Sequence, residues 1–352
     1  MKRAVLMLIG AIFFGIFIIS INTDLMKEVT TYRYSPASKF PSDKYRFGDL
    51  YGFSYLHPYK VRALSTEDLR SYYIKNRPQT GTELYGIVDS YLWSFVPNDS
   101  LFRQVDAYRA TRWDYMAKQF YLNPAKRNVL ILEMVERRVR YTTPDTAMFY
   151  KHLGLVDSPT KESVSDIYAT NWWKEHVFNP NIEQNIEFNL FDYTVFTPFK
   201  EAKAWLNHRV FNRISQDVVL SKTRQQLYYK QTIDSTKNSS SFMHLRAGEV
   251  DTMVAGLNQV YTHYRKAGFN EVYLVIMPNP VSVLEPHFNQ YKYNDLVPRL
   301  QKNPGLKMPV IDIYSKLLRF RRERIYQISD THWDKIGILA GIAQIDSVLA
   351  IR

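Results

Sequence analysis

Two groups of side chains, far apart in the chain, have the types that nucleophilic catalysis requires. Near the C-terminus, Asp330 stands two residues before His332. A carboxylate at this spacing can accept a hydrogen bond from the Nδ1–H group of the imidazole within one loop, which fixes the tautomer and leaves Nε2 free to act as a base. The expected nucleophile is Ser90, where the apolar run 84–88 ends in Asp89-Ser90. Together, Ser90, His332 and Asp330 would form a hydrolase or acyl-transfer triad. The alternative is chance, because the chain holds eight His residues and a single Asp-x-His can occur without a catalytic role.

A strand must position the serine. The run 84–88 is too short for a helix and is apolar throughout except for Gly86, so it predicts a buried parallel strand with Ser90 just beyond its carboxyl end. Open α/β sheets place their chemistry at these ends. The same criteria predict strands over 128–135, 272–277 and 310–314.

Helices are expected between and after these strands. The Ser65-x-x-Asp68 pattern predicts a capped helix through Tyr73, and the region around 101–121 is interpreted as helical. Apolar residues at three- and four-residue spacing predict a helix from Gly248 that Gly268 caps, and a terminal helix over 334–351. The sum is an α/β fold with a parallel sheet flanked by helices. Residues of about 141–242 are less regular, and we interpret them as a helical insertion that could line a cleft or contact a partner.

Composition limits the possible partners. The 352 residues are 45% hydrophobic and 23% charged, as in a globular protein, and the absence of Cys excludes disulfides, thiol catalysis and Cys-based zinc sites. A formal net charge of +12 favours polyanions or an anionic membrane surface. Because the basic residues are scattered and no nucleic-acid-binding motif is present, no nucleic acid partner is expected. The many aromatic residues suit packing above all, and also the sugar-binding surfaces of a glycan partner.

The N-terminus predicts a membrane anchor. Lys2 and Arg3 precede an apolar run over 4–21, which would span roughly 27 Å as a helix. A cleaved signal peptide is the alternative, but a small-x-small cleavage site is lacking, so we expect an uncleaved signal anchor over 1–21. The basic flank would stay in the cytoplasm. A stalk over 22–41 and a domain over 42–352 would then lie outside it, in the periplasm if the membrane is a bacterial inner membrane.

Three blocks of this sequence resemble the SGNH, or GDSL-type, esterase superfamily. They are IVDSY at 87–91, LEMVER at 132–137 and DTHW at 330–333. More specifically they resemble the SGNH-like O-acetyltransferases, such as the alginate acetylation proteins, that work with membrane-bound O-acyltransferases. The resemblance implies a flavodoxin-like sheet and a Ser-His-Asp mechanism with no cofactor and no metal. It also implies an exported polysaccharide as substrate and a multi-pass membrane-bound O-acyltransferase as partner.

The resemblance also assigns expectations to single residues. The backbone amide of Ser90 would contribute to an oxyanion hole. Asn279 is a candidate oxyanion donor, with loop capping as the alternative, and Arg137 is a candidate for binding an anionic substrate, with a structural ion pair as the alternative. The family usually has Gly before Asp-Ser, whereas this chain has Val88, whose branched side chain would crowd the approach to the serine amide.

Three functions therefore remain open. The first is an O-acyltransferase or esterase that acetylates or deacetylates an envelope glycan. The second is a catalytically degenerate, membrane-tethered component that binds glycan or assists assembly of an acetylation system. The third is a purely structural envelope protein.

Overall fold

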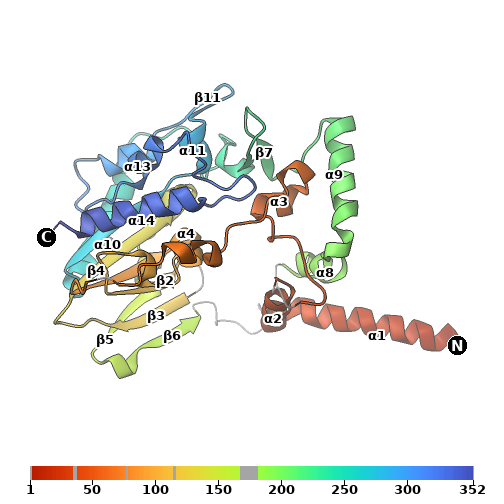
Figure 1. The fold of residues 1–352 in the computed structure, drawn as a ribbon, viewed down its shortest axis with the longest axis horizontal. Coiled ribbons are helices and arrows are strands. Elements are labelled where there is room, and N and C mark those ends of the chain that lie inside the picture. Colours follow the sequence, from red (N-terminus) through yellow and green to blue (C-terminus); the bar gives the residue numbers. More distant parts are fainter. Residues whose placement is uncertain (1, 35–37, 77, 114–115, 167–180, 352) are drawn as a thin grey trace. The chain divides into compact units, whose positions relative to one another are not determined.

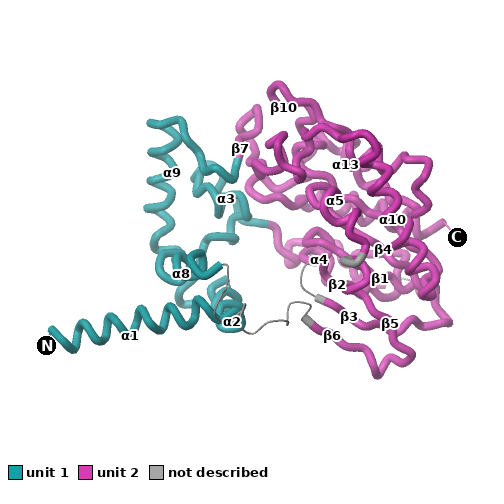
Figure 2. Tube along the Cα trace, turned by 180° about the vertical axis from the view of Figure 1, so that it is seen from behind, with its two compact units in different colours: residues 1–63, 168–218 teal, residues 64–167, 219–352 magenta. Residues whose placement is uncertain are grey.

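A computed structural model describes residues 2–34, 38–76, 78–113, 116–166 and 181–351. The chain forms two compact units, coloured separately in Figure 2. Unit 1 comprises residues 1–63 and 168–218, and unit 2 comprises residues 64–167 and 219–352. The expected stalk thus belongs to unit 1, and the expected insertion contributes residues to both units. Residues 167–180 of that insertion lie outside the described residues.

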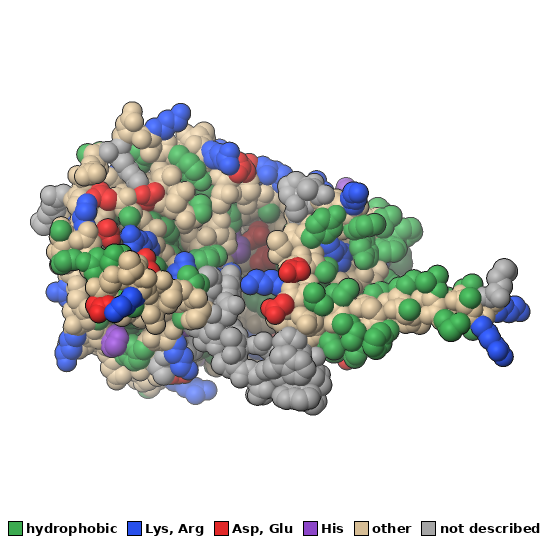
Figure 3. All heavy atoms as spheres, turned by 90° about the horizontal axis from the view of Figure 1, so that it is seen from below, with side chains coloured by type: hydrophobic (Ala, Val, Ile, Leu, Met, Phe, Trp, Pro, Cys, Tyr) green, Lys and Arg blue, Asp and Glu red, His purple; other side chains and the backbone are tan. Residues whose placement is uncertain are grey.

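Unit 1 begins with α1 (Lys2–Ile21), a helix long and apolar enough to cross a membrane. Its side chains up to Phe14 are exposed, and Figure 3 shows hydrophobic side chains all along this projecting helix. The segment expected to be a stalk contains a further helix, so it is not wholly extended. The other elements of unit 1 are α2 (Thr23–Tyr34), α3 (Asp49–Ser54), η1 (His57–Tyr59), α8 (Ile182–Phe191), η5 (Thr194–Phe196) and α9 (Thr197–Phe211).

Unit 2 holds nearly all the strands. Its elements, with β7 starting on the last residue of unit 1, are η2 (Thr66–Tyr72), β1 (Thr82–Val88), α4 (Ser90–Phe95), η3 (Asp99–Leu101), β2 (Ala107–Arg112), β3 (Met116–Tyr121), β4 (Arg127–Val135), α5 (Glu136–Thr142), α6 (Ala147–His152), β5 (Leu153–Val156), η4 (Pro159–Lys161), β6 (Ser163–Asp166), β7 (Val218–Leu220), β8 (Leu227–Tyr229), η6 (Lys230–Thr232), α10 (Glu249–Lys266), β9 (Glu271–Met277), α11 (Pro280–Leu284), β10 (His287–Phe288), β11 (Tyr291–Lys292), α12 (Leu296–Gln301), α13 (Ile313–Arg319) and α14 (Lys335–Leu349).

The core of unit 2 is a parallel four-stranded sheet in the order β2-β1-β4-β9. The register pairs Ile87 of β1 with Leu132 of β4, and Leu132 in turn with Leu274 of β9. All three side chains are fully buried, as expected for strands covered on both faces. Helices flank this sheet; α10 and α13 contact β9, and Figure 1 shows α14 crossing in front of the strands. The expected mixed α/β fold with a flanked parallel sheet is confirmed at this level.

Several predicted elements match the structure and others do not. Strands β1, β4 and β9 and helices α10 and α14 lie where the sequence predicts them. The helical interpretation of 101–121 is wrong, because β2 and β3 occupy most of that region. The strand predicted over 310–314 is reduced to one bridge between Val310 and Leu274, since Asp312 caps α13 immediately afterwards. Within 141–242 the described residues include four short strands, β5 to β8, so the insertion is not wholly helical.

Candidate active site

The serine stands at the junction of β1 and α4. Asp89 has extended backbone dihedral angles and is the N-cap residue of α4, and Ser90 is the first residue of that helix. The buried strand fixes the position of the junction from one side. From the other side, Tyr91 and Phe95 anchor the short helix, because both side chains are buried in the core. The nucleophile therefore sits on a turn that two packed elements hold at both ends.

The structure brings the three predicted triad residues together. The Ser90 hydroxyl lies 2.7 Å from Nε2 of His332. Asp330 contacts Nδ1 of the same ring and also accepts a hydrogen bond of 2.9 Å from the His332 backbone amide. An ionised Asp330 thus favours the tautomer with hydrogen on Nδ1, so that Nε2 accepts the serine proton. This is the geometry of an activated serine nucleophile with an oriented base.

Aromatic rings hold the imidazole in place. The centroids of the Tyr91 and Phe95 rings lie 5.0 and 5.5 Å from that of His332. The Tyr91 hydroxyl donates a hydrogen bond of 2.5 Å to the carbonyl oxygen of Thr331, which ties the histidine loop to α4. Trp333 packs edge-on against Tyr91 at 5.6 Å. Helix α4 therefore positions both members of the Ser–His pair.

Helix α14 supports the other side of the histidine loop. Trp333 is fully buried, and a Cβ added at Gly341 would lie only 2.5 Å from its ring. Only glycine lets the helix approach the indole this closely. The loop that carries Asp330 and His332 is thus held between α4 and α14.

A buried glutamate that the sequence reasoning did not single out supports the serine turn. Glu133 of β4 is fully buried, and its Oε2 accepts a hydrogen bond of 2.6 Å from the Asp89 amide. Burial raises the pKa of Glu133 well above its ordinary value, the negative charge of Asp89 raises it further, and the neighbouring Arg137 opposes the shift. The strand register explains this position: Leu132 of β4 pairs with Ile87 of β1. Glu133, the next residue of β4, therefore lies beside the end of β1, where the turn begins.

The backbone amide of Ser90, the expected oxyanion donor, has a hydrogen-bond partner within the turn. It donates a hydrogen bond of 2.7 Å to Oδ1 of Asp89, the residue before it. The second carboxylate oxygen, Oδ2, lies 3.5 Å from Nε of Arg138. While the contact between Asp89 and the Ser90 amide is made, it competes with the catalytic use of that amide. The contribution of the Ser90 amide to an oxyanion hole therefore stays a prediction.

Asn279 lies in a different cluster, beyond the end of β9. Its backbone amide donates to Oε2 of Glu136 at 2.8 Å, and its Nδ2 group donates to the Ser241 hydroxyl at 3.0 Å. Ser282 joins the same buried network with a 2.7 Å hydrogen bond to Glu136. The sheet order places β4 between β9 and β1. The side-chain amide is thus engaged in a structural network two strands away from Ser90, and burial raises the pKa of the Glu136 carboxyl at its centre.

Arg137 follows β4 at the same edge of the sheet as Ser90. Its side chain is half-buried, and its Nη1 atom is buried without a hydrogen-bond partner among the described residues. Of the two neighbouring arginines, Arg138 is the one within ion-pair distance of Asp89. Arg137 therefore keeps hydrogen-bonding capacity that an anionic group could use.

The Val88 side chain packs into the core beside Gly86. Its side chain is fully buried, and a Cβ added at Gly86 would lie 2.7 Å from Cγ1 of Val88. The branched side chain therefore fills core space that the glycine two residues earlier leaves open. The Val88 carbonyl oxygen accepts a hydrogen bond of 3.1 Å from the Trp113 amide, so its backbone is paired as well.

Unit 1 contains a cavity of about 840 Å³, and Tyr55, Asp192 and Lys200 are among its lining residues. Comparisons with protein-family models, with curated proteins and with solved structures find no match for this chain.

Proposed function

We propose that this chain is a membrane-anchored serine acyltransferase or esterase of the SGNH type. The observation that carries the proposal is the 2.7 Å contact between the Ser90 hydroxyl and Nε2 of a His332 that Asp330 orients. Acyl transfer by a serine requires a hydroxyl in contact with a histidine that a carboxylate orients, and Ser90, His332 and Asp330 have this arrangement at the carboxyl end of a parallel strand. The resemblance of the blocks at 87–91, 132–137 and 330–333 to SGNH-like O-acetyltransferases supports the same class.

The proposed reaction has two steps. Ser90 Oγ attacks the carbonyl carbon of an acyl ester while His332 takes the serine proton, and Asp330 stabilises the imidazolium. The imidazolium then gives its proton to the leaving alcohol, which leaves an acyl-serine ester. In the second step a hydroxyl of the acceptor attacks that ester while His332 takes its proton. The bond between the acyl group and Ser90 Oγ breaks, the imidazolium returns the proton to Oγ, and the acyl group stays on the acceptor. Water in place of the acceptor would give hydrolysis. No cofactor or metal takes part.

The proposed substrate is an exported polysaccharide or another cell-envelope glycan. The apolar helix α1, with Lys2 and Arg3 at its start, supports a single-pass inner-membrane protein whose catalytic unit lies outside the cytoplasm. A protein so placed needs activated acyl groups delivered across the membrane. A multi-pass membrane-bound O-acyltransferase is the proposed partner that supplies them.

One observation favours a second function, that of a catalytically degenerate glycan-binding or assembly component. The Asp89 carboxylate holds the Ser90 amide that would otherwise stabilise the developing oxyanion. Were this contact kept throughout the reaction, acyl transfer would lose one important electrostatic contribution. Arg137 could still bind an anionic glycan in that case, because its Nη1 atom has no hydrogen-bond partner among the residues that the structure describes.

Kinetics of the purified full-length protein with an aryl acetate, with and without a glycan acceptor, separate the two functions. The enzyme proposal predicts release of the aryl alcohol at a rate that Ser90→Ala and His332→Ala each reduce to background. Asn279→Ala is the matched control, because this residue lies in the neighbouring network and not at the serine. Wild-type turnover no higher than that of Ser90→Ala, together with retained glycan binding, would favour the second function.

A further inference from the structure

Helix α9 of unit 1 has its polar and apolar faces reversed with respect to a helix of a soluble protein. Such a helix normally buries its apolar stripe and exposes its charged side chains. In α9 the residues turned toward the rest of the unit include Lys200 and Glu201, whereas Phe199, Trp205 and Val210 are 73, 59 and 61% exposed. Phe199 and Val210 are eleven residues, about three turns, apart and lie on one outward face, and Trp205 lies to the side of it.

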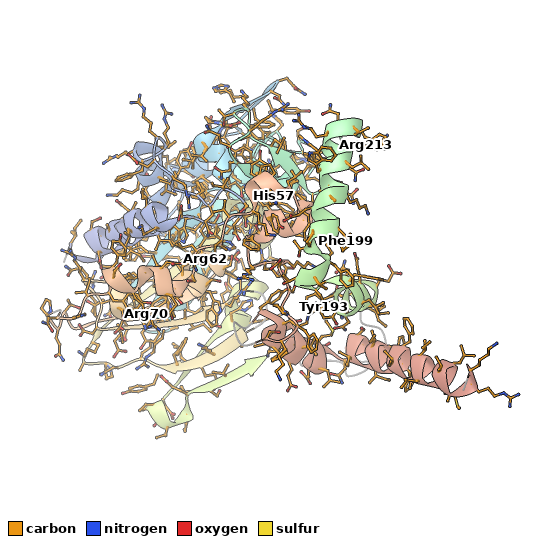
Figure 4. All side chains as sticks on the ribbon, turned by 45° about the vertical axis from the view of Figure 1, so that its right-hand side comes forward. His57, Arg62, Arg70, Tyr193, Phe199 and Arg213 are labelled. Atoms are coloured by element: carbon orange, nitrogen blue, oxygen red, sulfur yellow. The ribbon has the colours of Figure 1, made fainter. Side chains whose placement is uncertain are left out.

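The inward face is held by hydrogen bonds and ion pairs. Lys200 Nζ lies 2.9 Å from Oδ1 of Asp192. Glu201 accepts a hydrogen bond of 2.5 Å from the Tyr51 hydroxyl and contacts Nδ1 of His57 at 2.9 Å. Figure 4 labels His57 and Phe199 on opposite sides of α9. Rotation of the helix to bury its apolar face would break these contacts, so the exposed orientation is built into the unit.

Exposed apolar side chains extend beyond α9 along the adjoining segment. We call the following residues the α8–α9 apolar face: Phe191, Val195, Phe196, Phe199, Trp205, Leu206, Val210 and Phe211. Exposed apolar side chains gathered on one segment in this way mark a site of interaction with a membrane or another protein.

The same unit contains the apolar helix α1, and the two features are joined directly. The Nδ2 groups of Asn185 and Asn189 donate hydrogen bonds of 2.9 and 3.0 Å to the carbonyl oxygen and hydroxyl of Ser20. Ser20 is fully buried at the end of α1, so α8 packs where a spanning helix would leave the bilayer. In Figures 1 and 2, α9 runs across the direction of α1. A helix so directed lies along the membrane surface when α1 spans the membrane.

We infer that the α8–α9 apolar face binds the outer surface of the bilayer that α1 crosses, with α9 lying in the headgroup region. Helices that lie in this region combine Trp, Phe and Leu on one face with Lys and Arg beside them. Helix α9 also carries the exposed Arg209, which can reach lipid phosphates. This inference goes beyond the proposed activity and rests only on α1 as the anchor.

Fluorescent labelling of the reconstituted full-length protein tests the inference. The chain has no Cys, so Trp205→Cys or Val210→Cys gives one thiol for an environment-sensitive NBD label. In vesicles of three parts phosphatidylethanolamine to one part phosphatidylglycerol, both labels should shift to the blue. A spin label near the headgroup end of the acyl chain should remove roughly half of their fluorescence, because interfacial helices reach only about 5–10 Å into the boundary.

Two controls keep the outcomes distinct. Val164→Cys places the label on another exposed apolar residue, in unit 2, and should show neither the shift nor the quenching. Phe13→Cys in α1 should be quenched by a spin label near the methyl end of the acyl chain. Labels at 205 and 210 that behave like the one at 164 would overturn the inference and assign the face to a protein partner. An unquenched label at 13 would also overturn it, because α1 would then not be a membrane anchor. Ser90 labelling with a fluorophosphonate in the same vesicles reports on the proposed activity separately.

Discussion

At the scale of single residues, His332 depends on a different partner at each ring nitrogen. Asp330 contacts Nδ1 and the serine hydroxyl contacts Nε2. Asp330→Asn should leave the fold intact but favour the tautomer with hydrogen on Nε2, which cannot accept the serine proton. We expect the acylation rate with an aryl acetate to fall by roughly 10⁴-fold, the size of effect seen for the equivalent change in a well-studied triad. Asp334→Asn is a useful control, since this nearby carboxylate caps α14. Equal losses in both variants would argue against the assigned role of Asp330.

Glu133 gives a second prediction at this scale, through the pH dependence of stability. Its pKa in the folded protein is raised by burial, so the folded state keeps the proton that the unfolded chain loses above the ordinary value of 4.5. The wild type must therefore lose free energy of unfolding as pH rises from 4.5 toward the folded pKa. Glu133→Gln keeps an acceptor for the Asp89 amide and removes this dependence. Urea unfolding at pH 4.5 and at neutral pH should show the variant gaining stability relative to the wild type as pH rises. A stability difference that does not change with pH would contradict the buried, proton-retaining state.

At the scale of secondary structure elements, the end of β1 shows how a strand accommodates a residue that family resemblance disfavours. Val88 fills space above Gly86 and is fully buried. Val88→Gly should accordingly lower the free energy of unfolding by about 2–4 kcal/mol, from the cavity and from glycine's backbone entropy. We do not expect it to raise turnover, because the valine side chain packs into the core beside Gly86. Val164→Gly, at an exposed strand position, should cost much less. A faster Val88→Gly enzyme of unchanged stability would show that the valine does crowd the site.

The same elements show what the sequence could and could not predict. Strands β1, β4 and β9 are buried apolar runs, so the sequence pattern predicted them. It also predicted the carboxyl end of the sheet, where Ser90 and Arg137 follow their strands. Strand β2 is an edge strand with half-exposed, charged side chains such as Arg109, and this pattern does not distinguish a strand from a helix. The role of Glu133 and the competing contact between Asp89 and the Ser90 amide depend on strand register and on hydrogen bonds across the turn. Neither can be read from residue spacing.

At the scale of the whole molecule, α1 makes the prediction about topology. The basic pair at its start favours retention of the N-terminus in the cytoplasm. A periplasmic reporter fused after Arg352 should be active and a cytoplasmic reporter at the same place should not. Exchange of Lys2 and Arg3 for Glu should weaken this preference, since the charge asymmetry sets the orientation. Release of the protein as soluble material would remove the anchor from the account.

The central claim, that Ser90 is an activated nucleophile, is tested most directly by mass spectrometry of the intact protein and its peptides after reaction with a fluorophosphonate. The account predicts one adduct, on the peptide that contains Ser90, which is absent in Ser90→Ala and in His332→Ala while both variants keep the wild-type circular dichroism spectrum. An adduct on any other residue, or full labelling of Ser90 in the His332→Ala variant, would contradict it.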